Sequence, residues 1–265
     1  MPDAGALEGI DPRHERLARL VLGARSVVAL TGAGISVPSG IPDFRTPATG
    51  IWANVDPMEV AHVDVWRRDP QRFWAFYGHR FAVLGEVEPN PAHAALAELE
   101  RRGALDAVLT QNIDLLHEKA GSREVVELHG SIAGAHCPAC GHRADLAETL
   151  GLIETAVDGV PRCTACGGVL KPDVVLFGDM LPPVAVDRAE RFAARADLML
   201  CIGSSLVVHP VADLPLRTLR GGGQVAIVTT SETPYDDVAA VRLDGDVVDE
   251  LTGVIAAIDR LRESA

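Results

Sequence analysis

Short apolar runs that stop at glycine or polar residues recur along the chain, and amphipathic segments separate them. The runs are rich in Val, Ile and Leu without alternation, which is typical of strands buried on both faces of a parallel sheet. The sequence predicts such strands at 26–31, 106–110, 124–129, 198–202 and 224–229. Apolar positions at helical spacing predict helices over 11–24, 91–102, 114–120 and 247–261. Strands that alternate with helices indicate an α/β fold, with helices on both faces of the sheet.

Two stretches interrupt this alternation. Residues 46–88 are rich in aromatic side chains and irregular in pattern, and residues 133–170 hold four cysteines. Because both stretches lie between predicted strands, we expect them to be insertions that pack together as a small domain. The larger domain would then consist of residues 1–45, 89–132 and 171–265. A cleft between the two is where ligands usually bind in open α/β folds.

The four cysteines form two similar knuckles, in which Cys137 pairs with Cys140 and Cys163 with Cys166, at the spacing C-x2-C-x22-C-x2-C. Four thiolates at this spacing suit the tetrahedral coordination of Zn²⁺, and the glycine after each knuckle lets the backbone turn back over the metal. Because protein fills all four positions, the zinc would be structural. A disulfide pair or a redox C-x-x-C motif is the alternative. The fifth cysteine, Cys201, lies in an apolar run and is expected in the core.

Length and charge narrow the class of protein. The 265 residues suffice for one large and one small domain. The formal net charge is −13, with 24 basic against 37 acidic side chains, which argues against a nucleic-acid partner because such partners need a basic face. The N-terminus has no features of a signal peptide, and no apolar run reaches the length of a membrane span. We therefore expect a cytoplasmic protein with no membrane partner.

A glycine turn follows the first predicted strand, where Gly32 and Gly34 precede Ser36. Glycines at this place let the backbone approach a pyrophosphate, and a helix N-terminus supplies N–H donors. Tight strand-to-helix turns also use glycine for their own geometry, and Val37 stands where the Rossmann fingerprint has its third glycine. Taken alone, the turn leaves both a dinucleotide site and a plain structural turn open.

Polar side chains continue this turn and follow the next two strands. An acid, an aromatic ring and an arginine occupy positions 43–45, where they would cover a bound nucleotide. Gln111, Asn112 and Asp114 follow the second strand, and His129 closes the third. The carboxyl ends of parallel strands form the ligand edge of a sheet, so we expect these side chains to lie close together. His129 is a candidate general base; the alternative is a histidine bonded into the strand edge.

Taken together, these motifs resemble the sirtuin family, the NAD-dependent protein deacylases. Besides the cysteines, the shared motifs are GAGIS at 32–36, GIPDFR at 40–45, TQNID at 110–114, HG at 129–130, KPDVVLFG at 171–178, GSSL at 203–206 and DVV at 246–248. The resemblance covers nearly the whole chain. It implies a Rossmann-type domain that carries a small domain made of a zinc ribbon and a helical module. It also implies NAD as cosubstrate, acyl-lysine proteins as substrates, and nicotinamide, free lysine and O-acyl-ADP-ribose as products.

The resemblance further implies roles for individual residues. His129 would be the general base on the ribose hydroxyls, and Asn112 and Asp114 would line the nicotinamide pocket. The residues implied to contact NAD are Gly32, Ala33, Gly34, Ser36, Asp43, Phe44, Arg45, Gln111, Asn112, Ile113, Asp114, Gly203, Ser204, Ser205, Thr229, Asp246 and Val247. The residues implied to border the acyl-lysine tunnel are Val175, Phe177 and Val208, and the peptide would pair there as an added strand. Thr229 stands where many family members have asparagine.

A Y-x-x-R motif, Tyr77 to Arg80, stands where sirtuins selective for acidic acyl groups carry it. One helical turn would place both side chains on the same face, where they would bind the carboxylate of a succinyl or malonyl group. The alternative is that Tyr77 packs in the small domain and Arg80 is solvated. Val37 and Asp43 differ from the alanine and threonine of acid-selective relatives, so ordinary deacetylation stays equally open.

Two other functions fit parts of the sequence. A mono-ADP-ribosyltransferase would use the same NAD pocket and the same His129. A non-catalytic module that binds NAD or a protein through its zinc ribbon would need no base and no nicotinamide pocket. The presence of Asn112, Asp114 and His129 together argues against that last interpretation.

Overall fold

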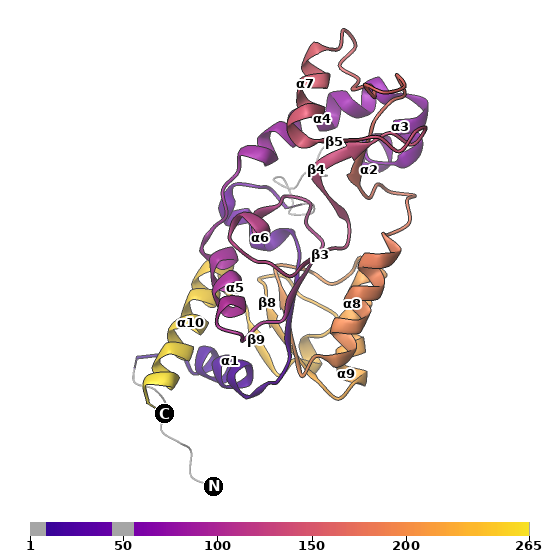
Figure 1. Cartoon of the computed structure of the whole chain (residues 1–265). Helices are drawn as coiled ribbons and strands as arrows, with labels where there is room; N and C mark the ends of the chain where they lie inside the picture. The colour runs from indigo at the N-terminus through magenta and orange to yellow at the C-terminus, as the bar shows by residue number, and fades with distance from the viewer. Residues whose placement is uncertain (1–8, 44–55, 265) are drawn as a thin grey trace.

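The computed structural model describes residues 9–43 and 56–264, and a parallel sheet of six strands forms its larger body (Figure 1). Across the sheet the strands are β3 (Val125–Glu127), β2 (Ala107–Thr110), β1 (Val27–Thr31), β7 (Leu198–Ile202), β8 (Gln224–Val228) and β9 (Val241–Leu243). The chain fills the sheet outward from β1 in one direction and then outward from β7 in the other. The strand order therefore reverses between β1 and β7, which opens a crevice at their carboxyl ends. The predicted α/β fold with a Rossmann-type sheet is confirmed.

Helices cover both faces of this sheet. One face packs against α1 (Pro12–Gly23), α5 (Pro91–Arg101) and α10 (Val247–Glu263), and the other against α8 (Pro183–Arg195) and α9 (Leu214–Arg220). Along β1 the side chains alternate between these two cores, and all five residues are buried. Both faces of the strand need apolar side chains, which explains the unbroken apolar run in the sequence. Cys201 on β7 is fully buried, as expected.

A second, smaller group of elements lies at one end of the molecule (Figure 1). Its antiparallel sheet contains β5 (Arg143–Asp145), β4 (Gly130–His136) and β6 (Lys171–Val174). Its helices are α2 (Pro57–Val60), α3 (Val63–Arg68), α4 (Pro70–Glu86) and α7 (Leu146–Thr155). The domain boundaries proposed above stay a prediction, and we note that β6 pairs with β4 rather than with the large sheet.

Although the sequence pattern of 46–88 is irregular, residues 57–86, which the structure describes, are mostly helical, in keeping with the helical module that the family resemblance implies. On α4 the apolar side chains of Phe73, Trp74, Tyr77 and Phe81 recur at helical spacing and pack into one buried cluster. This helical period was not apparent in the sequence, because aromatic residues have a lower helix propensity than Leu or Ala and the segment contains many of them. Trp52, in the same stretch, lies outside the described residues.

Two tryptophans join the helices to the cysteine segment. The indole N–H groups of Trp66 and Trp74 donate to the same carbonyl oxygen, that of Leu170, over 3.0 and 3.2 Å. Leu170 itself is fully buried in the core beside the cysteines. The two insertions therefore pack against each other through an apolar cluster, and both indoles bond to one backbone carbonyl where they meet.

Several elements of the large domain differ from the sequence prediction. The strand β9 contains only three residues and was not predicted, and α8 and α9 were not assigned. The short helix α6 (Leu116–Lys119) begins later than predicted, because Leu115 adopts a left-handed conformation with φ 65°. Over the described ranges, no helix combines the length and apolar character of a membrane span.

Candidate active site

Two glycine-containing loops interlock at the point where the strand order reverses. The N–H of Gly34, after β1, donates to the carbonyl of Gly203, after β7, over 2.8 Å. A Cβ atom on Gly34 would lie 2.7 Å from the Cα of Gly203, and Gly203 has a φ of +60°. Both positions therefore require glycine for the contact between the loops. This contact alone accounts for glycine at position 34, with no need for a bound ligand. The glycine turn is therefore weaker evidence for a dinucleotide site than the motif suggests.

A cleft of about 1410 Å³ opens along the carboxyl edge of the large sheet and extends to the smaller group of elements. Of the residues implied to contact NAD, those lining it are Gly32, Ala33, Gly34, Ser36, Asp43, Gln111, Asn112, Ile113, Asp114, Gly203, Ser204, Ser205, Thr229, Asp246 and Val247. Val175, Phe177 and Val208 line it as well, as do Tyr77, Arg80 and His129. Phe44 and Arg45 lie outside the described residues. One cavity thus brings together every described residue of the implied NAD and substrate sites.

A buried hydrogen-bond cluster forms one wall of the cleft. The Ser36 hydroxyl donates to Oδ2 of Asp114 over 2.7 Å, and it accepts from Nδ2 of Asn112 over 3.1 Å. The other oxygen of Asp114 accepts from the N–H of Leu116 over 3.1 Å. Burial raises the pKa of Asp114, while the bond from Ser36 opposes this. The cluster holds Asn112 and Asp114 in fixed orientations beside the cleft.

His129 presents a basic nitrogen to the cleft. Its Nδ1 lies 2.9 Å from the carbonyl oxygen of Gln111. A carbonyl can only accept, so Nδ1 carries the proton and Nε2 has a free lone pair. Burial lowers the pKa of His129, although the bond to Gln111 opposes this, so the ring is neutral at pH 7. The residue lies just after β3, in the connection to β4, and not within the strand as predicted.

The segment 175–178 forms the other wall near His129. The N–H of Val175 donates to the carbonyl of His129 over 2.8 Å, and Phe177 forms a parallel bridge with His62. A partly buried ion pair of 2.9 Å between Lys171 and Asp179 joins the residues on either side of the segment. This ion pair was not predicted from the sequence. The only sign of it in the sequence is that a basic and an acidic residue stand at the two ends of the motif.

Tyr77 and Arg80 both reach the cleft from α4, as the one-turn spacing predicts. Tyr77 is mostly buried, and its ring stacks on Phe73 with the centroids 4.7 Å apart. The Arg80 guanidinium lies 4.2 Å from the ring centroid of Phe76. Burial raises the pKa of Tyr77 and lowers that of Arg80. Tyr77 is thus part of the core, as the alternative held, but the cation beside it is half-buried in the cleft rather than free in solvent.

The four cysteines come together as predicted. One sulfur atom from each of Cys137, Cys140, Cys163 and Cys166 lies within 4.8 Å of the other three. Gly141 and Gly167, which follow the knuckles, both have φ near +76°, and each donates its N–H back to the first cysteine of its knuckle over 2.8 Å. The four cysteines form no disulfide, and their sulfur atoms converge on one point. This arrangement fits a single structural Zn²⁺ better than two disulfides.

Two buried histidines behind the cleft were missed. His93 on α5 and His117 on α6 have ring centroids 5.0 Å apart. His93 lies 3.5 Å from the Ser36 hydroxyl, and Nε2 of His117 lies 2.9 Å from that of Thr31. Their place behind the site comes from tertiary packing, and no local pattern in the sequence indicates it.

Comparisons with known proteins agree with this geometry. The model of the Sir2 family matches residues 32–210. An NAD-dependent protein deacetylase of Sulfolobus acidocaldarius is 44% identical over 251 residues, 95% of this chain and 97% of that protein. An NAD-dependent protein deacylase 1 of Archaeoglobus fulgidus is 41% identical over 242 residues, 89% and 96% of the two chains. A solved structure described as "Sir2-p53 peptide-NAD+" is similar with a TM-score of 0.83 and 40% identity, over 91% of this chain and 96% of that one.

Proposed function

Because the chain belongs to the Sir2 family, we propose that it is an NAD-dependent deacylase of protein lysine residues. The observation that carries the proposal is the neutral His129, whose free Nε2 faces the same cleft as the glycine loops and the Asn112–Asp114 wall. A base, a long cleft and a wall of oriented polar groups are what a reaction between a dinucleotide and an acylated peptide needs.

NAD supplies an electrophilic ribose carbon whose leaving group, nicotinamide, departs without charge. The chain's own groups then have separate tasks. Asn112 and Asp114 orient the nicotinamide end, and the interlocked loops at Gly34 and Gly203 border the diphosphate. The wall at 175–178 aligns the peptide so that the acyl oxygen faces the ribose. Nε2 of His129 takes a proton from a ribose hydroxyl, which activates that hydroxyl toward the acyl carbon.

Zinc takes no part in this chemistry. The thiolates of Cys137, Cys140, Cys163 and Cys166 would hold it with no position left for water, so its contribution is to the folding of the small module. A quartet of reduced thiols also suits a reducing compartment, and we therefore place the protein in the cytoplasm, which cell fractionation tests.

The test of the function is a His129→Ala variant assayed with NAD and an acetyl-lysine peptide. Positioned proton transfer contributes about 10²- to 10⁴-fold, so turnover should fall by at least that range while zinc content and melting temperature stay unchanged. The matched control is His136→Ala, which removes a histidine of β4 that pairs with Asp173 of β6 and does not line the cleft. A His129→Ala protein with more than about a tenth of the wild-type rate would refute the role of the base.

The same assay separates deacylation from ADP-ribosyl transfer. A deacylase lowers the mass of the peptide by the mass of the acyl group and releases O-acyl-ADP-ribose. A mono-ADP-ribosyltransferase adds ADP-ribose to an acceptor and leaves the acyl group in place. A wild-type protein that only adds mass to the peptide would replace the proposed function with that alternative.

We propose in addition that the cleft accepts acidic acyl groups beside acetyl. The support is the Arg80 guanidinium, which is half-buried in the cleft, contacts the Phe76 ring and forms no carboxylate pair within the described part of the chain. An acyl carboxylate would replace the water that this cation loses on burial.

The acyl preference is tested with Arg80→Met on one peptide carrying either succinyl-lysine or acetyl-lysine. A charge-assisted hydrogen bond of about 1.5–3 kcal/mol corresponds to roughly 10- to 150-fold in kcat/KM for the succinyl peptide, with the acetyl peptide nearly unaffected. Arg72→Met is the matched control, because Arg72 lies on the same helix and pairs with Glu59 at the surface. Equal losses for both acyl groups, or no wild-type desuccinylation, would contradict the proposal.

A further inference from the structure

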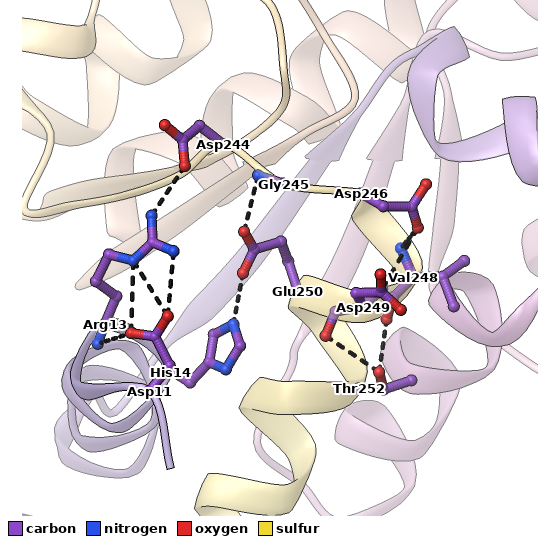
Figure 2. A network of polar contacts seen from close by, with 10 residues as sticks. All are labelled: Asp11, Arg13, His14, Asp244, Gly245, Asp246, Val248, Asp249, Glu250 and Thr252. Atoms are coloured by element: carbon purple, nitrogen blue, oxygen red, sulfur yellow. Dashed lines mark hydrogen bonds and ion pairs between the residues drawn. The ribbon is translucent and has the colours of Figure 1, made fainter.

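A network of charged groups outside the cleft holds one of the cleft's loops in place (Figure 2). Residues 244–246, the β9–α10 loop, connect β9 to α10. Gly245 and Asp246 of this loop line the cleft, as does Val247, the first residue of α10. The groups that hold it come from α1, at the start of the chain, and from the first turn of α10. Neither helix contributes a side chain to the cleft beyond Val247.

The center of the network is the Glu250 carboxylate, which is only 6% exposed. One of its oxygens accepts the N–H of Gly245 over 2.8 Å, and the other lies 2.5 Å from Nε2 of His14. A Cβ atom on Gly245 would lie 2.5 Å from the first oxygen, so the carboxylate rests directly on the loop backbone. Glu250 thus connects the loop to α1 through His14.

The His14 ring is itself seated on α10. A Cβ atom at Gly253 would overlap Nδ1 and Cε1 of the ring, so this edge of the imidazole lies directly against the backbone of that glycine. Glycine in the middle of a helix is destabilising relative to alanine. The close approach of His14 is a physical reason for glycine at this position.

A second contact from α1 holds the adjacent loop residue. Nη1 of Arg13 donates to the Asp244 carboxylate over 2.8 Å, while its other donors reach Asp11, the N-cap of α1. Consecutive residues of α1 therefore hold consecutive residues of the loop: Arg13 binds Asp244, and His14 acts on Gly245 through Glu250 (Figure 2).

The loop lies at the opposite end of the cleft from His129. It follows β9, at one edge of the six-stranded sheet, whereas His129 follows β3, at the other edge. A dinucleotide that reaches from one end to the other would place its nicotinamide near Asn112 and Asp114, and its adenosine near the β9–α10 loop. Changes in the loop should therefore alter the binding of the adenosine half and leave the chemical step unchanged.

We propose that α1 is a positioning element for the adenosine half of NAD, acting through His14 and Glu250 on the β9–α10 loop. The inference rests on the proposed function, because it takes NAD as the occupant of the cleft. None of these side chains touches the reacting atoms. Their effect is to fix the backbone that the nucleotide contacts, which lowers the cost of ordering that loop on binding.

The experiment measures binding of ADP-ribose, which contains adenosine and diphosphate but no nicotinamide, to the full-length zinc-loaded protein. Glu250→Ala and His14→Ala should each raise the Kd of ADP-ribose about tenfold, or about 1.4 kcal/mol. Glu250→Gln keeps an acceptor for the Gly245 N–H and should recover most of the affinity. Steady-state assays should show the same rise in the KM for NAD with kcat unchanged.

Gly253→Ala provides an independent test, because it changes no charge and favours the helix. Its methyl group should displace the His14 ring and weaken ADP-ribose binding as His14→Ala does. The matched control is Arg25→Ala, which removes an exposed ion pair with Asp197 at the amino-terminal ends of β1 and β7, away from the cleft, and should change neither constant. Binding of an acetyl-lysine peptide without NAD should be unchanged in every variant.

The outcomes are distinguishable. Wild-type affinity for ADP-ribose in Glu250→Ala, His14→Ala and Gly253→Ala would overturn the proposal. Parallel losses of ADP-ribose and peptide binding would also overturn it, because they would mean general structural damage. A wild-type protein that binds no ADP-ribose at all would instead refute the proposed function, and the inference would fall with it.

Discussion

Two histidines buried behind the cleft should make the fold unusually sensitive to acid. Burial lowers the pKa of His93 to about 4 and that of His117 to about 3, the second helped by its proximity to His93. Both rings are therefore neutral in the folded protein over the whole range from pH 7 to pH 5. In the unfolded chain each would titrate near its ordinary value of 6.5. Below that value the unfolded chain binds protons at these two histidines while the folded protein does not, so the free energy of unfolding falls.

The sign and size follow from linkage. Stability contributed by the neutral rings is complete above pH 6.5 and is lost as the pH falls, until the loss ends below about pH 4 for His93 and about pH 3 for His117. At pH 5 the cost is about 2 kcal/mol for each histidine. The raised pKa of Asp114, caused by burial, acts in the opposite direction, so the total for the protein is smaller than the histidines alone would give.

The contribution of one histidine is isolated by His117→Gln, whose amide can donate to or accept from the Thr31 hydroxyl and so replaces Nε2 in either tautomer. Urea unfolding of both proteins is measured at pH 8, 7 and 5. The loss of unfolding free energy from pH 7 to pH 5 should be about 2 kcal/mol smaller in the variant, while from pH 8 to pH 7 the two should change alike. Zinc, Asp114 and all other titrating groups are common to both and cancel in the difference. Equal losses in the two proteins would refute the reasoning.

Three further predictions concern the framework. Cys163→Ser should lose its zinc, which contributes on the order of 10 kcal/mol to a small module, and metal analysis with limited proteolysis would detect this; full zinc content would contradict the assignment. Gly203→Ala should destabilise the fold in urea by more than Gly222→Ala, because both have positive φ but only the first would add a Cβ that meets backbone; equal effects would contradict the loop contact. Trp74→Phe should lower the unfolding free energy by more than about 1 kcal/mol, because it removes one of the two bonds to Leu170 and leaves a cavity beside the buried ring; no change in urea would contradict this.

The parallel sheet could be predicted from the sequence because its strands are buried on both faces. Unbroken apolar runs such as 198–202 have few other interpretations. The gathering of Gln111, Asn112 and His129 followed from the same fact, since the carboxyl ends of parallel strands meet at one edge. The cysteine quartet was predicted from spacing alone, because tetrahedral coordination restricts the sequences that can provide it.

The remaining features depend on contacts between distant residues. β9 has too few residues to give a pattern, and it is a strand only because β8 is already there to pair with it. From the sequence, the glycines at 34 and 203 were attributed to a bound dinucleotide. In the structure they are required because the two loops contact each other closely there. The seat of His14 on Gly253 joins two helices at opposite ends of the chain, and no local pattern of residues announces such a contact.

The position of β1 in the center of the sheet has a consequence for synthesis on the ribosome. One edge of β1 pairs with β2, whose residues 107–110 emerge early, but its other edge pairs with residues 198–202 of β7. All of the cysteine segment is translated in between. Until β7 emerges, the nascent chain presents an apolar central strand with an open edge, the kind of surface on which chains associate wrongly. The protein therefore completes its sheet late, and the time needed to make the zinc-binding insertion lengthens the interval in which β1 is exposed to aggregation.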